Sequence, residues 1–121
     1  MMSSTPTVHV RRIYEHDDPQ DGLRIFVDRI WPRGMTKAAA HLDEWCKQIA
    51  PSTELRTWFN HDPTLLAGFI DCYQVELQDP ERAAALNHLR TLAKTRTLIL
   101  LTATKRIELS HAQVLADLIH A

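Results

Sequence analysis

The sequence predicts an α/β fold, a small single-domain layer structure with a short, mainly parallel sheet and about four helices. Two short apolar runs, residues 23–27 and 98–101, are typical of strands that are covered on both faces. Between them, apolar residues recur at helical spacing. A chain of 121 residues can bury a single core without a disulfide or a metal. We therefore expect one domain over residues 8–121, after a short polar lead, residues 1–7, that we expect to be disordered.

The first strand is expected over residues 8–14, where apolar and polar residues alternate. Arg11 and Arg12 in this segment favour an edge position in the sheet. Residues 15–22 are rich in turn-forming residues and too short to hold a crossover helix. The N-terminal part is therefore predicted to be an edge strand or a hairpin, followed by a loop.

Three amphipathic helices are predicted between the two buried strands, around residues 55–59, 65–77 and 86–93. Ser52 or Thr53 is expected to cap the first helix. The pairs Asp62-Pro63 and Asp79-Pro80 each place a capping carboxylate before a proline, which favours a helix start. Ser110 followed by Gln113 resembles a capping box, so a last helix is expected to pack back on the sheet.

Composition excludes several classes of protein. The formal net charge of −1 argues against a general duplex-binding protein. The sequence has neither a long apolar span nor a secretory signal, and Cys46 and Cys72 do not form a C-x-x-C pair. The seven histidines show no metal-binding spacing. We expect a cytoplasmic protein with reduced thiols, no metal, no cofactor and no membrane partner.

Polar segments follow both buried strands, at residues 28–34 and 102–106. Because the carboxyl ends of parallel strands meet at one edge of a sheet, the two segments should lie together and form the ligand site. Arginines, lysines and an aromatic ring suit a carboxylate or a phosphate. The residues of these segments that are predicted to bind the ligand are Asp28, Arg29, Trp31, Arg33 and Lys105. Lys47 and Arg56, which lie outside the two segments, are added to the predicted set because they belong to the second motif quoted below.

Two histidines are candidates for acid–base work at this site. His61 precedes the capping residue Asp62, and a carboxylate can orient a neighbouring imidazole, although Asp62 also has a purely capping role. His111 lies at a helix start, where the positive end of the helix dipole lowers the pKa of an imidazole. If His111 acts, it should act as a neutral acceptor or a general base.

The segment DRIWPRG, followed by LDEWCKQIAPSTELRTWFNHDP, resembles the YeaO-like family of small bacterial proteins, part of domain of unknown function 488. The resemblance covers about residues 8–119 and implies a small cytosolic α/β domain without an established reaction. The last third departs from the family pattern. Thr102 and Arg106 stand where relatives usually have tyrosine and aspartate, and Ser110 stands where they have asparagine.

Three functions remain open at this stage. The first is a site that binds a small anion such as a phosphate ester, a nucleotide or a carboxylate, with or without turnover. The second is a nucleic-acid-associated or regulatory module that uses Trp31 and Trp58 for stacking. The third is a protein-interaction domain in which the Trp, Arg and Asp motif forms a structural network. The sequence leaves the oligomeric state open.

Overall fold

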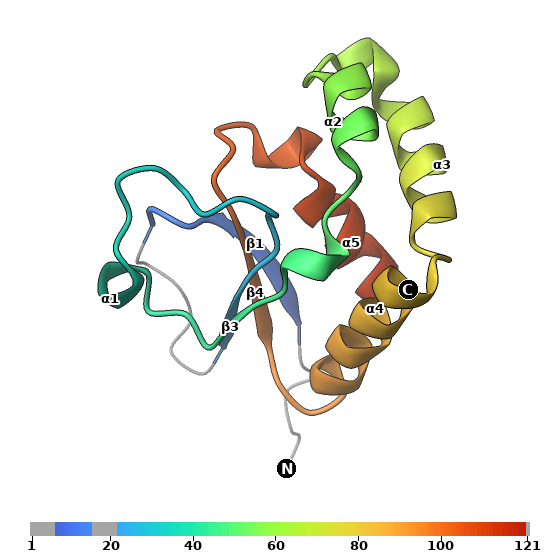
Figure 1. Cartoon of the computed structure of the whole chain (residues 1–121). Coiled ribbons are helices and arrows are strands. Elements are labelled where there is room, and N and C mark those ends of the chain that lie inside the picture. Colours follow the sequence, from blue (N-terminus) through green and yellow to red (C-terminus); the bar gives the residue numbers. More distant parts are fainter. Residues whose placement is uncertain (1–6, 16–21, 121) are drawn as a thin grey trace.

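A four-stranded parallel sheet forms the centre of the protein in the computed structural model, which describes residues 7–15 and 22–120 (Figure 1). The strands are β1 (Val8–Arg12), β2 (Leu23–Phe26), β3 (Glu44–Trp45) and β4 (Leu98–Thr102), in the order β1-β4-β2-β3. All three strand pairings are parallel. The predicted α/β class with a mainly parallel sheet is therefore confirmed.

The middle of the sheet is β4, which pairs with both β1 and β2. Leu98 lies opposite Val8 on one side and Leu23 on the other, and every residue of β4 is buried. The predicted parallel pairing of the two apolar runs is confirmed. Since β4 separates β1 from β2, the first strand is an edge strand and the hairpin alternative is wrong. The lead predicted over residues 1–7 lies outside the described residues, apart from Thr7.

The helices match the predicted positions and add short elements that the sequence did not reveal. The predicted helices correspond to α2 (Thr53–Phe59), α3 (Leu66–Glu76), α4 (Pro80–Ala93) and α5 (His111–His120). The additional elements are α1 (Lys37–Ala40) and the 3-10 turns η1 (Lys47–Ile49), η2 (Pro63–Leu65) and η3 (Ile107–Leu109). Among the described residues, no helix is long and apolar enough to cross a membrane.

Most of the predicted caps are present. The Ser52 hydroxyl accepts from the backbone N–H of Leu55, and the Asp62 carboxylate caps η2, which leads directly into α3. Ser110 accepts from the Gln113 N–H at the start of α5. The prediction for Asp79 is wrong in one respect: it occupies the cap position of α4, but its carboxylate pairs with an arginine in the first turn instead of the backbone.

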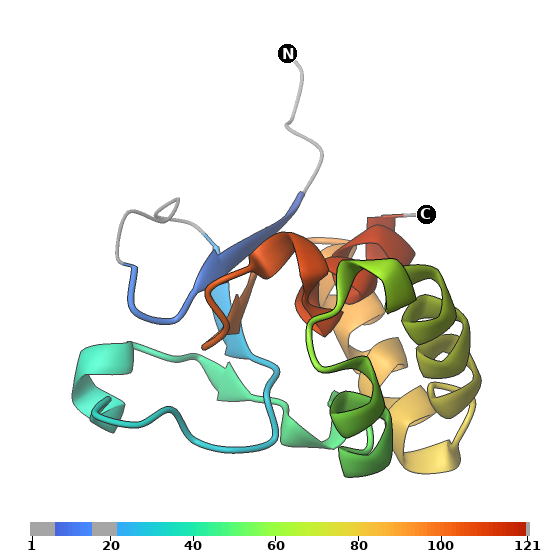
Figure 2. The same cartoon turned by 90° about the horizontal axis from the view of Figure 1, so that it is seen from above.

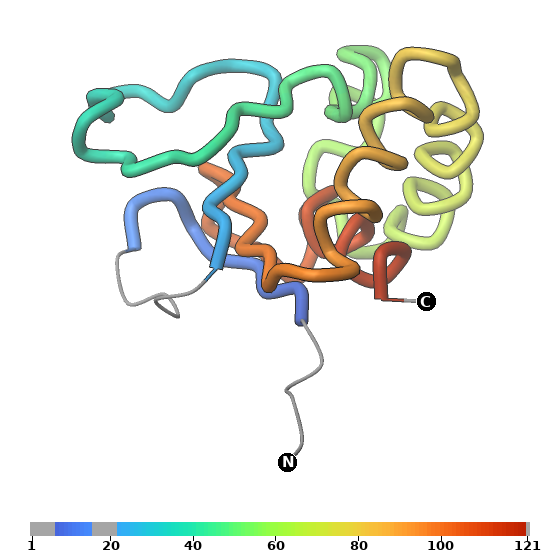
Figure 3. The backbone as a smooth tube through the Cα atoms, turned by 90° about the horizontal axis from the view of Figure 1, so that it is seen from below, coloured from blue at the N-terminus to red at the C-terminus, as the bar shows by residue number. Residues whose placement is uncertain are grey.

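Each face of the sheet is covered by a different part of the chain. The helices α2 to α5 gather on one side, and the segment between β2 and β3 extends on the other (Figures 2 and 3). The helical side buries the larger core, whereas the second core contains Phe26, Ile99 and Leu101 with Trp31 and Trp45 packed against them. The packing of Trp31 and Trp45 therefore holds the segment between β2 and β3 against this face of the sheet.

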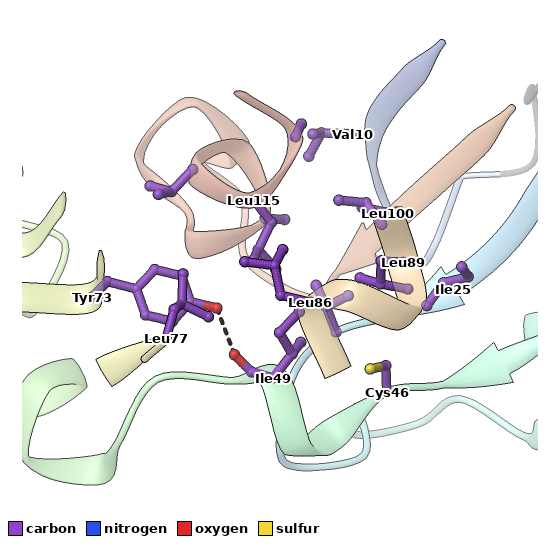
Figure 4. Close-up of a cluster of buried hydrophobic side chains, with 14 of the residues drawn as sticks. Val10, Ile25, Cys46, Ile49, Tyr73, Leu77, Leu86, Leu89, Leu100 and Leu115 are labelled. Carbon is purple, nitrogen blue, oxygen red and sulfur yellow. Dashed lines mark hydrogen bonds between the residues drawn. The ribbon is translucent and has the colours of Figure 1, made fainter. Parts of the chain in front are cut away.

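In the larger core, a buried hydrogen bond joins a helix to a connecting segment. Tyr73 of α3 is fully buried, and its hydroxyl donates to the carbonyl of Ile49 in η1 at 2.6 Å (Figure 4). Burial raises the pKa of Tyr73 well above its ordinary value. The neutral phenol is therefore the form that holds η1 against α3.

We predict that Tyr73→Phe lowers the free energy of unfolding by about 1–2 kcal/mol, because it leaves the buried Ile49 carbonyl without its donor. Urea denaturation measures this change. The matched control is Tyr14→Phe, since the exposed Tyr14 hydroxyl donates to the Arg33 carbonyl at 3.3 Å. Equal stability losses in the two variants would contradict the role assigned to the buried bond.

Candidate functional site

A pocket of about 760 Å³ lies where the segments after β2 and β4 meet the end of α2 and the start of α5. Figure 1 shows α2 and the segment that leads into α5 at the same end of the molecule. This is the carboxyl edge of the sheet, where the sequence placed the ligand site. Of the nine predicted site residues, six line the pocket: Asp28, Arg29, Trp31, Arg56, His61 and His111.

The carboxylate of Asp28 connects the ends of the two central strands. One oxygen accepts from the Thr102 hydroxyl at 2.8 Å, and the other accepts from the Ala103 backbone N–H at 2.9 Å. The Asp28 carbonyl accepts from the indole N–H of Trp45 at 2.7 Å. Asp28 is therefore hydrogen-bonded to β4 through its side chain and to β3 through its main-chain carbonyl.

The imidazole of His111 lies against this cluster. Its Nε2 is 2.9 Å from the carbonyl oxygen of Val27 and 3.5 Å from the nearer oxygen of Asp28. Tyr73 meets the ring edge-on, with centroids 6.0 Å apart. Burial is the main cause that lowers the pKa of His111 below its ordinary value. The charge of Asp28 and the Val27 carbonyl oppose this shift, and the charges of Arg56 and His61 add to it.

Two arginines bring positive charge to the pocket from separate elements. Arg29 follows Asp28 in the segment after β2, and Arg56 lies on α2, which is held in place by the buried side chains of Leu55 and Phe59. Both arginines are exposed. Among the described residues, neither guanidinium has an ion pair or a side-chain hydrogen bond, and the Asp28 carboxylate is bonded to Thr102 and Ala103 instead.

His61 lines the pocket from the connection that follows α2. Asn60 and His61 both have left-handed backbones, with φ of 44° and 55°. Asparagine and histidine adopt this conformation more readily than most residues, although it is still uncommon. Two successive left-handed residues turn the chain sharply after α2 and place the exposed imidazole of His61 at the pocket.

Trp31 contributes an aromatic wall to the pocket and is also part of the second core. Its indole N–H donates to the Met35 carbonyl at 2.6 Å, and its ring packs edge-on against Phe26 and Trp45. The ring is thus held in one position, and one side of it is shared with the core of the domain.

Three predicted binding residues do not line the pocket. Arg33 is exposed in the turn that contains Gly34, which has a positive φ of 78°. The ammonium of Lys47 lies over the indole of Trp45, 5.1 Å from the ring centroid. Lys105 is exposed in the segment after β4. The structure does not bring these cations together with the six residues that line the pocket.

Sequence reasoning missed two residues that build the site. Thr102 and Ser110, which the sequence marks as departures from a family pattern, are both buried. Thr102 donates to Asp28, and the Ser110 hydroxyl donates to the Ile107 carbonyl at 2.7 Å. A hydroxyl at the end of an otherwise apolar strand is the signal that could have identified Thr102. Among the described residues, no group of three or more potential metal ligands is present.

The fold and the pocket define a small parallel α/β domain with a polar pocket at the carboxyl edge of its sheet. Residues 7–121 match the family model described as "Inactive DUF488-N3 subclade". The chain is 42% identical over 110 residues to the uncharacterised protein YeaO of Escherichia coli. The matching region covers 91% of this chain and 94% of YeaO. The chain therefore belongs to the YeaO-like DUF488 family, as the sequence predicted.

Other relatives are equally uncharacterised. The chain is 46% identical over 113 residues to uncharacterised proteins of Mycobacterium tuberculosis and Mycobacterium bovis, with 93% of each chain covered. No solved structure matches this chain.

We predict that His111 makes the protein less stable in acid. Because its pKa is lowered on folding, the unfolded state binds more protons just below the ordinary pKa of 6.5. The free energy of unfolding should therefore fall as the pH falls through 6.5, by up to about 1.4 kcal/mol per pH unit, until the folded imidazole also gains its proton.

Urea denaturation at several pH values between about 7.5 and 5 measures this slope. His111→Phe should flatten it, whatever its effect on stability at neutral pH. The matched control is Asn87→Leu at an exposed position of α4, which changes no titratable group and should keep the slope of the unmodified protein. An unchanged slope in the His111 variant would refute the prediction.

We also predict that Thr102→Val lowers stability by about 2 kcal/mol, because it removes a buried hydrogen bond to a carboxylate. Thr102→Ser keeps the hydroxyl and should lose clearly less. Thermal unfolding compares the two variants. If valine and serine have the same effect, the hydroxyl contact with Asp28 does not matter for stability.

Proposed function

We propose that this protein binds a small anionic molecule, such as a phosphate or a carboxylate, in the pocket at the carboxyl edge of the sheet. The observation that carries the proposal is the pair Arg29 and Arg56. They reach one pocket from two elements, and neither has a carboxylate partner among the described residues. Guanidinium groups hold carboxylates and phosphates through paired, charge-assisted hydrogen bonds.

The surroundings of the two arginines support an anion over a cation. Asp28 brings a negative charge, but both of its oxygens accept hydrogen bonds from within the protein. The pocket also includes Ser110 and His111 at the start of α5, where the helix dipole favours negative charge. The local balance of the pocket therefore differs from the overall charge of −1.

Binding without turnover is the form of this function that we favour. The matching subclade is described as inactive. Among the pocket residues, the buried hydroxyls of Thr102 and Ser110 both donate to acceptors inside the protein. These two hydroxyls serve the fold, which is consistent with a pocket that holds a ligand and leaves it unchanged.

The nucleic-acid alternative has less support. A stacking site for bases needs aromatic rings with open faces. Trp31 packs against Phe26 and Trp45, and its N–H bonds to Met35. Trp58 is half exposed, but it does not line the pocket.

The structural alternative accounts for Asp28 and Trp31, which are bonded and packed within the domain, but not for the arginines, which it would pair with Asp28. Among the described residues, the partners of the Asp28 side chain are Thr102, Ala103 and His111.

We place this function in the cytoplasm of a bacterium as part of the same proposal. The relatives described above come from bacteria. Cys46 and Cys72 are free thiols, as expected in a reducing compartment.

We predict that inorganic phosphate, malate or adenosine monophosphate raises the thermal unfolding midpoint of the protein at roughly millimolar concentration. Replacing both arginines, Arg29→Gln with Arg56→Gln, should weaken binding of the same probe at least about tenfold, because charge-assisted hydrogen bonds are lost. Isothermal titration calorimetry measures the affinities.

The control for this test is Arg96→Gln, which changes an exposed arginine just before β4, at the opposite edge of the sheet. It should bind the probe as the unmodified protein does. The proposal fails if none of the three probes stabilises the protein. It also fails if the control weakens binding as much as the double variant.

A further inference from the structure

The hydrogen bond of His111 determines which of its ring nitrogens carries the proton. Nε2 lies 2.9 Å from the carbonyl oxygen of Val27, and a carbonyl can only accept. The proton must therefore be on Nε2. Asp28 places a second acceptor 3.5 Å from the same nitrogen, which favours the same tautomer. In the neutral ring, Nδ1 is then an acceptor.

This second nitrogen has no hydrogen-bond partner among the described residues, and the side chain of His111 is only 12% exposed. Tyr73 meets the ring edge-on, and together with the Val27 bond this contact fixes its orientation. A nearly buried acceptor without a donor is costly. Since the ring lines the pocket, a molecule bound there can supply a donor to it.

We propose that the pocket selects anions that carry a hydroxyl next to their charged oxygens, with His111 Nδ1 accepting from the hydroxyl and Arg29 and Arg56 binding the charge. Hydrogen phosphate and 2-hydroxycarboxylates belong to this class, whereas sulfate and plain carboxylates do not. The inference rests on the proposed anion site and adds selectivity to it. A site that offers an unmatched acceptor discriminates strongly against an analogue that lacks the donor.

The groups that face His111 keep the imidazole in the neutral form that this selectivity needs. Burial lowers its pKa, and the charges of Arg56 on α2 and His61 after α2 act in the same direction. Asp28 after β2 acts in the opposite direction. Tyr73 on α3 is itself neutral, because burial raises its pKa well above the ordinary value. Near neutral pH the ring therefore offers an acceptor at Nδ1.

The test uses two pairs of anions that differ in the hydroxyl. Binding of phosphate and sulfate, and of malate and succinate, is measured by calorimetry at pH 7.5 and constant ionic strength. We expect the hydroxyl-bearing member of at least one pair to bind about tenfold more tightly or better. The pair that responds distinguishes a phosphate site from a hydroxycarboxylate site.

Variants connect the selectivity to the imidazole. His111→Phe keeps a ring but removes the acceptor, so it should abolish the preference within the pair while the arginines still bind the anion. His88→Phe is the matched control and should keep the preference. A second readout is pH: sulfate should bind more tightly once the pH falls below the lowered pKa of His111, because the doubly protonated ring donates from Nδ1.

The outcomes separate the two proposals. Equal affinities within both pairs would overturn the selectivity and leave the anion site standing. If no probe binds, both proposals fail. A preference that persists in His111→Phe would also overturn the role of His111. Should that variant not fold, long-range ¹H–¹⁵N spectra of the unmodified protein decide the point, because a proton on Nδ1 in the neutral ring refutes the inference.

Discussion

The carboxylate of Asp28 is the constraint on which the rest of the site depends. A carboxylate that is only 20% exposed is costly unless its oxygens are hydrogen-bonded. Here they accept from the Thr102 hydroxyl and the Ala103 N–H, so the first residues after β2 and β4 are held at one position. The Asp28 carbonyl, through Trp45, adds β3 to the same point. One residue thus joins three strand ends, and the pocket opens beside it.

The two faces of the sheet are stabilised in different ways. The helical face is stabilised by burial of many aliphatic side chains. In the described part of the chain, the helix on the other face has four residues. That face depends on Trp31 and Trp45, whose indole N–H groups bond to backbone carbonyls within the covering segment. Because Asp28 begins that segment, the same bonds that close the second core also place Arg29 at the pocket.

The sequence predicts the parts of the fold that depend on regular patterns. Buried apolar runs identified the central strands, and helical spacing identified α2 to α5. The two-residue strand β3 and the four-residue helix α1 are too short to produce a periodic pattern. Asp79 shows a similar limit, because an N-cap carboxylate with an arginine three residues later has two partners available, and here the arginine is bonded.

The candidate site was predictable as a sheet edge but not as a set of side chains. Polar residues after two parallel strands locate the edge. The backbone path of an irregular segment decides which residues face the pocket. The spacing of residues in the sequence does not predict that path. Arg29 and Arg33 lie in the same short motif, yet Arg29 lines the pocket, whereas Arg33 does not and its carbonyl accepts from the Tyr14 hydroxyl. The hydrogen bond from the Ala103 N–H to Asp28 could not be predicted from residue type, because the donor is a backbone group that nearly every residue has.

The thiols and hydroxyls of the chain bear on what the pocket does with a ligand. Burial, and then the charge of Glu44, raise the pKa of Cys46 to about 11, and this thiol lies in the larger core. A protonated, buried thiol is a poor nucleophile. The Thr102 hydroxyl donates a hydrogen bond to one oxygen of Asp28, and the Ala103 N–H donates to the other. Both oxygens of this carboxylate are therefore used to hold the strand ends. The described part of the pocket therefore combines two cations without carboxylate partners and one neutral acceptor, which is the set of groups that the proposed anion site requires.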